Sequence, residues 1–306
     1  MLKFILERLM WMLITLWVVF TITFFLMRAV PGGPFDSDRR VEPEILENLN
    51  RRFHLDEPLV QQYFRELSNV FFHFDLGYSF KLGDYTVNRV IAEGLPVSAA
   101  LGILALAFAL SLGLVAGITS AVRRGSVADL TLMSLATVGI ALPNFVIAGI
   151  SIILFVFLIP IFPAAGWGSF DQLILPALCL GAPHAADVAR ITRTSMLDVL
   201  SQDHIRTARA KGLSPLRVVW GHALPGALLP VVSYLGPATA YVLTGSLVIE
   251  QIFAIPGLGS HFVEAALQRD YTLAMGCVML YTVILFLMNM FVDMSYAFLD
   301  PRVELE

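Results

Sequence analysis

Residues 206–225, RTARAKGLSPLRVVWGHALP, form a basic and polar stretch between two apolar segments. Gly212 is placed to end a first short helix as its C′ residue, with Lys211 favourably placed in the last turn. Ser214 can then cap a second helix whose first residue is Pro215. A solvated connector that only fixes topology would account for the charge, but two capped helices are more order than such a connector needs. The stretch therefore predicts a surface on which another protein docks.

The composition of the whole chain is typical of a polytopic membrane protein. Of its 306 residues, 57% are hydrophobic and 14% are charged, and the mean hydropathy is +0.76. A soluble domain has roughly 25% charged residues. The net charge of −4 gives no reason to expect a nucleic acid as partner. The two cysteines, Cys179 and Cys277, both fall in apolar segments, which is typical of packing residues and not of a disulfide framework.

Six apolar segments are candidates for crossing a membrane, which takes about 20 residues of helix. The fourth is the weakest, because Pro176, Pro183 and His184 interrupt it. It is retained because the charges of the flanking loops require a crossing there. The sequence thus predicts an all-α membrane protein with six transmembrane helices, at 9–27, 95–122, within 130–171, from about 173, at about 227–249 and at about 271–298.

Lys and Arg are concentrated in three of the regions that flank these segments, and this bias predicts an orientation. The N-terminus, the loop at 123–124 and the loop at 190–217 carry them and are expected in the cytoplasm. Both termini are then cytoplasmic. The chain divides accordingly into an N-terminal transmembrane helix (1–30), an extracytoplasmic segment (31–96) and a core transmembrane domain (97–306) that contains the cytoplasmic loop at about 190–225.

Motifs of nucleotide binding and catalysis are absent from the sequence. It has no Gly-x-x-x-x-Gly-Lys-[Ser/Thr] P-loop, no His-Glu-x-x-His and no Gly-x-Ser-x-Gly. The stretch GLGSH at 257–261 is better explained by a turn than by a serine nucleophile. The spacing of His184, His204 and His222 matches no metal site, and packing at the membrane interface is the favoured interpretation. The chain is expected to be non-catalytic and to bind no metal or cofactor of its own.

Short motifs spread from end to end of the chain resemble those of the permeases of binding-protein-dependent ABC importers. The polar stretch is similar to their cytoplasmic EAA loop at Ala208, Gly212, Leu224 and Pro225. Further matches resemble the first of the two paired permeases of the oligopeptide/dipeptide class: RAVPGGPF at 28–35, HLDEP at 54–58, LGYSF at 76–80, ARITR at 189–193, IRTARAKG at 205–212, TGSLVIE at 244–250, PGLG at 256–259, RDY at 269–271 and DPR at 300–302.

This resemblance implies a fold, a function and a set of partners. The fold would be the six-helix type I importer permease, located in the inner membrane of a prokaryote. The chain would form half of a pathway for oligopeptides or dipeptides, and a second homologous permease would form the other half. Two ATPase subunits would bind ATP and Mg, and an extracytoplasmic binding protein would deliver the substrate. The ATPase would act on the loop through Ile205, Arg206, Thr207, Ala208, Arg209, Ala210, Lys211, Gly212, His222, Leu224 and Pro225.

The loop departs from the general importer pattern at three positions. Arg206 stands at the Glu position, Thr207 at the first Ala position and His222 at the Ile position, a basic variant that is common in the peptide class. Ile205, Ala208 and Gly212 share one narrow face of the first helix. We expect that face to let a partner surface approach closely.

The residues that contact cargo are less constrained by the sequence. Polar groups inside a membrane usually face the interior of the helix bundle, where they can line a pathway or join helices. Candidates for the pathway are Asn144, Ser233, Tyr234 and Thr239. Other cargoes of the same family, such as a nickel chelate or glutathione, remain alternatives to peptides. A stand-alone secondary transporter or channel is a further alternative, but the segments show no charged site at mid-membrane for a coupling ion. A membrane-embedded enzyme would need a nucleophile and a base, which the sequence does not offer.

Overall fold

The computed structural model describes residues 2–30, 32–35, 43–243 and 247–299. Within these ranges the chain is helical, apart from turns, loops and an isolated bridge between Tyr78 and Thr86. Three of the matched motifs extend beyond the described residues, at Pro31, at 244–246 and at 300–302. The all-α fold class predicted from the composition is confirmed.

The chain forms two compact units, of which the first contains residues 1–97 and 256–286. Its core joins the two ends of the sequence, because Phe20 and Phe24 of the first helix are buried with Met275 and Met279 of the last helix. The helices of this unit are α1 (Leu2–Ala29), α2 (Pro43–Arg52), α3 (Leu59–Phe72), the start of α4 (Val87–Val122), α13 (Leu258–Gln268) and the first half of α14 (Tyr271–Leu299).

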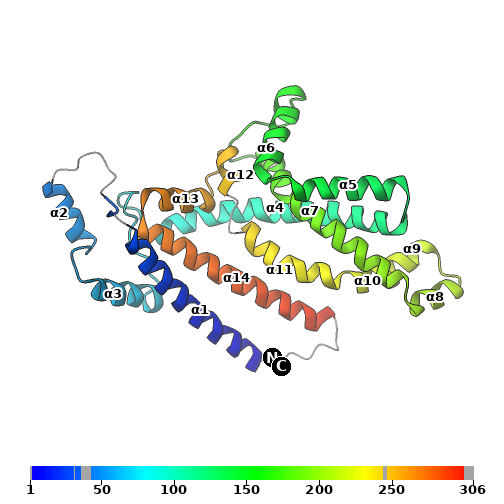
Figure 1. Ribbon diagram of the computed structural model, residues 1–306, viewed down its shortest axis with the longest axis horizontal. Helices are drawn as coiled ribbons and strands as arrows, with labels where there is room; N and C mark the ends of the chain where they lie inside the picture. The colour runs from blue at the N-terminus through cyan, green and yellow to red at the C-terminus, as the bar shows by residue number, and fades with distance from the viewer. Residues whose placement is uncertain (1, 31, 36–42, 244–246, 300–306) are drawn as a thin grey trace. The chain divides into compact units, whose positions relative to one another are not determined.

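The second unit contains residues 98–255 and 287–306 and holds the polar loop. Its long helix α7 (Phe170–Leu200) packs beside α5 (Val127–Ala141), as Figure 1 shows. The polar loop follows α7 directly. The other elements are α6 (Asn144–Ile152), the π-helix η1 (Ile153–Leu158), α8 (Asp203–Ala210), α9 (Pro215–Val218), the π-helix η2 (Val219–Ala223), α10 (Leu224–Ala227), α11 (Leu229–Leu243) and α12 (Leu247–Ile252).

Four helices are long and apolar enough to cross a membrane, and two bent pairs raise the number of candidate spans to six among the described residues. The third predicted span is one of these pairs, with a bend of 110° between 127–141 and 144–158. Pro143 causes the break, because it lacks an N–H and forces Leu142 into an extended conformation (ψ 128°). The other pair is bent by 52° between 215–227 and 229–243. Only its second arm corresponds to the fifth predicted span, at about 227–249, because the first arm belongs to the stretch predicted as a loop.

Small residues let α4 and α7 approach backbone to backbone. A Cβ added at Gly113 would lie 2.7 Å from the carbonyl oxygen of Ala185, and one added at Gly117 would lie 2.6 Å from that of Ala189. A Cβ added at Gly181 of α7 would lie 2.5 Å from the carbonyl oxygen of Ala105 of α4. Helices in a membrane gain little from the hydrophobic effect and associate through close packing of this kind.

Asp270 fastens the loop that contains Ser79 and Lys81 to α14 within the first unit. It is 1% exposed and caps α14 by accepting a hydrogen bond from the N–H of Leu273 (3.1 Å). Its other carboxylate oxygen accepts bonds from the hydroxyl of Ser79 and the N–H of Lys81. The motifs LGYSF and RDY, almost 200 residues apart, therefore meet at one carboxylate.

Candidate functional site

The polar loop of residues 201–225 has the order that its capping residues predict at the end of α8. Gly212 has φ +78°, a left-handed conformation that favours glycine. Its N–H donates to the carbonyl of Arg209 (3.0 Å), and the N–H of Leu213 donates to that of Ala208 (3.3 Å). These two bonds define a Schellman motif, so the predicted C′ position of Gly212 is confirmed.

The second helix of the loop also begins where the sequence indicates. Ser214 occupies the N-cap position and Pro215 the first turn, and the N–H of Val218 donates to the Ser214 carbonyl (3.0 Å). The Ser214 side chain makes no capping bond, so the start of α9 depends on backbone conformation and on Pro215. The chain then continues through η2 and α10 into α11.

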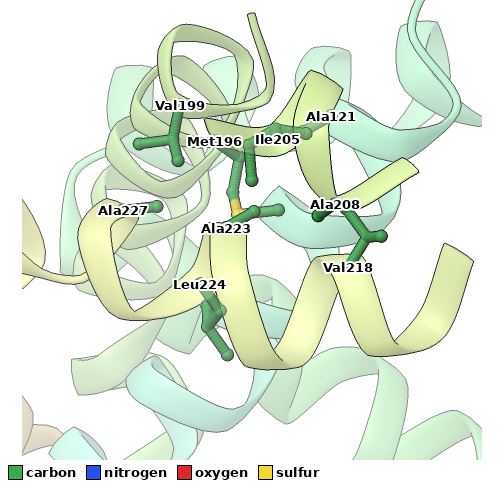
Figure 2. Packing of buried hydrophobic residues seen from close by; sticks show 9 residues of the cluster. All are labelled: Ala121, Met196, Val199, Ile205, Ala208, Val218, Ala223, Leu224 and Ala227. Atoms are coloured by element: carbon green, nitrogen blue, oxygen red, sulfur yellow. The ribbon is translucent and has the colours of Figure 1, made fainter. Parts of the chain in front are cut away.

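Two of the three residues of the narrow face that was expected to receive a partner are turned into the protein, whereas the third, Gly212, is exposed. Ile205 is fully buried and Ala208 is 5% exposed, and both side chains point into an apolar cluster (Figure 2). The cluster joins α8 to the end of α7 and to the helices that lead into α11, with contributions from Ala121, Met196, Val199, Val218, Ala223, Leu224 and Ala227. Ile205 and Ala208 are therefore covered within this chain, and contact of the loop with a partner stays a prediction for its exposed residues. Burial of these apolar side chains within the chain removes them from water, which is favourable.

The surface that the loop leaves accessible is basic, with two large apolar side chains. The exposed predicted residues are Arg206, Thr207, Arg209, Ala210, Lys211, Gly212, His222 and Pro225. Leu216 is 72% exposed and Trp220 is 59% exposed, and the sequence analysis missed both. No local signal singles them out, because the same loop contains other apolar residues, such as Val218 and Leu224, that are buried. Exposed apolar groups among cations are typical of a protein interface.

Most of the loop's positive charge is available to a partner. Arg206 approaches Asp203 at 3.3 Å, but both side chains are largely exposed, and such surface pairs contribute little. Among the described residues, no carboxylate forms an ion pair with Arg209, Lys211 or Arg217. The surface can thus bind carboxylates without first breaking strong internal bonds.

An ion pair between α5 and α7 fixes the helix from which the loop extends. Arg193 donates two bonds to Asp129, from Nε to Oδ1 (2.8 Å) and from a terminal nitrogen to Oδ2 (2.9 Å). Asp129 also accepts bonds from the Ser120 hydroxyl and from the N–H of Gly125 (2.8 Å). Sequence analysis placed Arg193 in a motif but missed its partner, because only tertiary contact brings the two residues together.

The predicted pathway residues are not all gathered in one place. Tyr234 on α11 bonds to Nδ1 of His184 (2.7 Å) and donates to Asp187 (3.0 Å), both on α7. Ser233 bonds within its own helix to the carbonyl of Leu229. Asn144 begins α6, which packs on α7 and α12, whereas Thr239 lies on α11. His184 and Asp187 thus join Tyr234 in a polar cluster that the sequence did not assign.

No group of three or more His, Cys, Asp or Glu residues is placed to hold a metal ion in the described part of the chain. His184 contacts Tyr234, whereas His204 and His222 lie exposed on the loop. The arrangement offers an exposed basic surface and a polar contact between helices, and neither has the geometry of a catalytic centre.

Residues 113–305 match the family described as the inner membrane component of binding-protein-dependent transport systems, and residues 1–102 match the N-terminal region of such membrane components. The chain belongs to this family. It is a multi-pass protein of the inner membrane, and the sequence-based resemblance to oligopeptide and dipeptide permeases is confirmed. Members of the family are non-catalytic membrane subunits, as expected for this chain.

Similarity to individual proteins extends over the whole chain. The dipeptide transport system permease protein DppB of Bacillus subtilis is 45% identical over 305 residues, covering 100% of this chain and 99% of that protein. The oligopeptide transport system permease proteins OppB of Haemophilus influenzae and of Escherichia coli K12 are 45% and 44% identical, each covering 99% of both chains.

A solved structure supports the fold. The MetNI methionine ABC transporter in an inward-facing conformation aligns with a TM-score of 0.56 and 18% identity, covering 69% of this chain and 96% of that one. At this level of identity the likeness shows a shared fold, in keeping with the predicted type I importer permease.

Proposed function

We propose that this chain is a permease subunit of an ATP-driven importer of oligopeptides or dipeptides. The observation that carries the proposal is the 44–45% identity, over essentially the full length, to permeases named for these two cargoes. Peptides share an ammonium group, a carboxylate and amide groups, so one pathway can serve many side chains if it binds these common groups.

The assembly in which it acts contains four further subunits. A second homologous permease completes the pathway, and two ATPase subunits bind ATP and Mg on the cytoplasmic side. An extracytoplasmic protein delivers the peptide. The N-terminus, the C-terminus and the loop at 190–225 face the cytoplasm, as the positive charges at 123–124 and 190–217 indicate.

The exposed basic surface of the loop, including Arg206, Arg209 and Lys211, docks against an ATPase subunit. Force can pass from this surface into the membrane because Ile205 and Ala208 are packed in one cluster with α7 and with α10, which leads into α11. A packed core transmits displacement, whereas a flexible connector would absorb it. The apolar cluster therefore makes α8 move with the spans on either side of the loop.

The polar cluster of Tyr234, His184 and Asp187 holds α7 and α11 together, within the part of the chain that moves with α8. Tyr234 bonds to both His184 and Asp187, so these two helices are joined at a point that is distinct from the apolar cluster. Asn144, Ser233 and Thr239 contribute polar groups to the pathway.

Uptake of a radiolabelled tripeptide tests the function, in cells that lack their own peptide permease and express this chain with its neighbouring genes. We expect ATP-dependent uptake that unlabelled dipeptides and oligopeptides inhibit. No uptake of the tripeptide, with uptake of a labelled nickel chelate or of labelled glutathione by the same cells, would show a different cargo. Accumulation that persists without the ATPase genes would support a stand-alone transporter and overturn the proposal.

A further inference from the structure

Helix α3 of the extracytoplasmic segment packs along the side of α1. The hydroxyl of Tyr63 accepts a bond from Nε1 of Trp17 (3.1 Å) and shares one with the hydroxyl of Thr21 (2.9 Å). Leu67, Val70 and other residues on the same side of α3 pack against the cluster formed by α1 and α14. One side of α3 is thus in continuous contact with a transmembrane span.

The contacts with α1 show how far α3 reaches toward the membrane centre. Arg28 is the first charged residue after the charge-free run of α1, and Thr21 and Trp17 precede it by seven and eleven residues. At 1.5 Å per residue they lie about 10 Å and about 16 Å further in along the helix, against a hydrocarbon half-thickness of about 15 Å. The ring of Tyr63 therefore reaches well below the level at which α1 leaves the membrane.

The charges between the two helices are arranged as they would be in a membrane. The Arg28 guanidinium turns back along α1 to stack over the ring of Phe24 (3.7 Å) and donates to Glu66 (2.6 Å) and Gln62 (3.2 Å). The side chains of Arg28 and Glu66 are only 7% and 19% exposed. Charges at membrane depth are expected to pair with one another and to face protein.

The outward side of α3 carries apolar groups that continue the lipid-facing surface of α1. Phe25 of α1 is 49% exposed and its ring stacks on Tyr63 (5.7 Å), which in turn contacts Phe64 (5.3 Å). Phe64 and Val60 of α3 are 62% and 65% exposed. These residues thus extend an apolar surface that begins on a span whose exposed residues face lipid.

We propose that α3 is an interfacial helix whose Val60–Phe64 edge lies in the hydrocarbon of the leaflet at the C-terminal end of α1. The extracytoplasmic segment is then anchored by lipid as well as by protein contacts. Amphipathic helices commonly bury their apolar side about 5–10 Å into the boundary between headgroups and acyl chains. The Tyr63 hydroxyl reaches deeper than this, because it bonds to Thr21 and Trp17 of α1. The polar side of α3, with Gln61 and Arg65, faces water.

Spin-label accessibility in a bilayer tests this placement. Phe64→Cys and, separately, Val60→Cys would be labelled with a nitroxide in the full chain, co-purified with its partner subunits and reconstituted in phosphatidylcholine. Frequent collision of the label with oxygen shows that it lies in hydrocarbon. Frequent collision with a water-soluble nickel chelate shows that it lies in water. Wild-type protein treated with the label corrects for Cys179 and Cys277, both of which are buried.

Ile45→Cys on α2 is the matched control, because Ile45 is also apolar and is 51% exposed. We expect oxygen to collide more often than nickel with labels at 60 and 64, and the opposite order at 45. A nickel preference at 60 and 64 would place this edge of α3 in water, and low collision with both reagents would mean that another protein covers it. Either result would overturn the proposal, and neither bears on peptide uptake.

Discussion

Gly212 is the residue whose backbone conformation lets the loop turn from α8 into α9. Its φ of +78° places it in the left-handed region, and nothing lies within 4 Å of the position where a Cβ would stand. The requirement for glycine is therefore conformational and does not arise from crowding. An L-residue in this conformation costs roughly 1–2 kcal/mol.

Gly212→Ala should loosen the loop without disturbing its surroundings. We expect the Schellman motif to be weaker by about 1 kcal/mol, which corresponds to about fivefold faster hydrogen exchange at the amides of 205–213. Gly212→Asn is the control, because asparagine tolerates the left-handed region, and it should fall between alanine and wild type. Equal exchange in all three proteins would show that this conformation is not what holds the loop.

Tyr234 is the residue that joins α7 to α11 through its hydroxyl. Tyr234→Phe keeps the ring but leaves His184 and Asp187 without this partner, at a cost of about 1–3 kcal/mol. Heating followed by size-exclusion chromatography should show a lower midpoint for loss of folded protein. Tyr85→Phe, which removes a hydroxyl from a half-exposed ring outside the cluster, should leave the midpoint unchanged. A midpoint that Tyr234→Phe does not lower would show that the hydroxyl does not stabilise this contact.

At the scale of elements, the contact between α4 and α7 depends on residues without side chains. A Cβ at Gly113 would meet both the carbonyl of Ala185 and the side chain of Val188 at 2.7 Å. Because main-chain atoms cannot give way as a flexible side chain can, the helices themselves would have to separate. Overpacking of this kind costs about 1–3 kcal/mol.

Gly113→Ala is therefore expected to lower the thermal midpoint of the folded protein, whereas Gly149→Ala should not. Gly149 lies inside α6, and a Cβ added there would have nothing within 4 Å, so alanine at this position gains helix propensity of up to about 1 kcal/mol. The thermal midpoints of both variants are measured by heating followed by size-exclusion chromatography. A Gly113→Ala protein as stable as wild type would show that α4 and α7 pack less closely than the structure indicates.

The ion pair of Asp129 and Arg193 links α5 to α7 and is testable as a pair. Removing either partner leaves the other charge without its bonds, and we expect each alanine variant to lose up to about 3 kcal/mol of local stability. The double variant should lose less than the sum of the two, by at least about 1 kcal/mol. Hydrogen exchange at the amides of 123–131 measures these opening energies. Strictly additive losses would mean that the two side chains do not interact.

At the scale of the whole molecule, the sequence predicts the spans and the loop well and the contacts poorly. Hydropathy finds every long helix, and Gly212 and Pro215 mark the caps of α8 and α9, because both signals are local. A proline at position 143 within an apolar run indicates a bend, but the sequence does not tell whether it kinks the span or breaks it by 110°, as it does here. The inward turn of Ile205 and Ala208 was missed, because helical spacing identifies a shared face but not what that face contacts.

The contacts that fix the fold join residues that are distant in sequence. Asp270 meets Ser79, and Arg193 meets Asp129, across separations that no local pattern encodes. The motifs LGYSF, ARITR and RDY were recognised by resemblance, and the structure supplies a physical reason for the first and third, which share one carboxylate. The exposure of Leu216 and Trp220 could not be predicted, because apolar residues of the same loop, such as Val218 and Leu224, are buried.

The central claim is that the exposed basic surface of residues 201–225 docks an ATPase subunit. It is tested most directly by the amount of ATPase that co-purifies with a tagged chain from native membranes. An Arg206→Glu and Arg209→Glu double variant is compared with an Arg123→Glu and Arg124→Glu variant, which reverses two exposed charges in the other loop expected on the same side. We expect the first variant to lose the ATPase while retaining the second permease, and the control to keep both. An unchanged yield of ATPase with the first variant would contradict the claim.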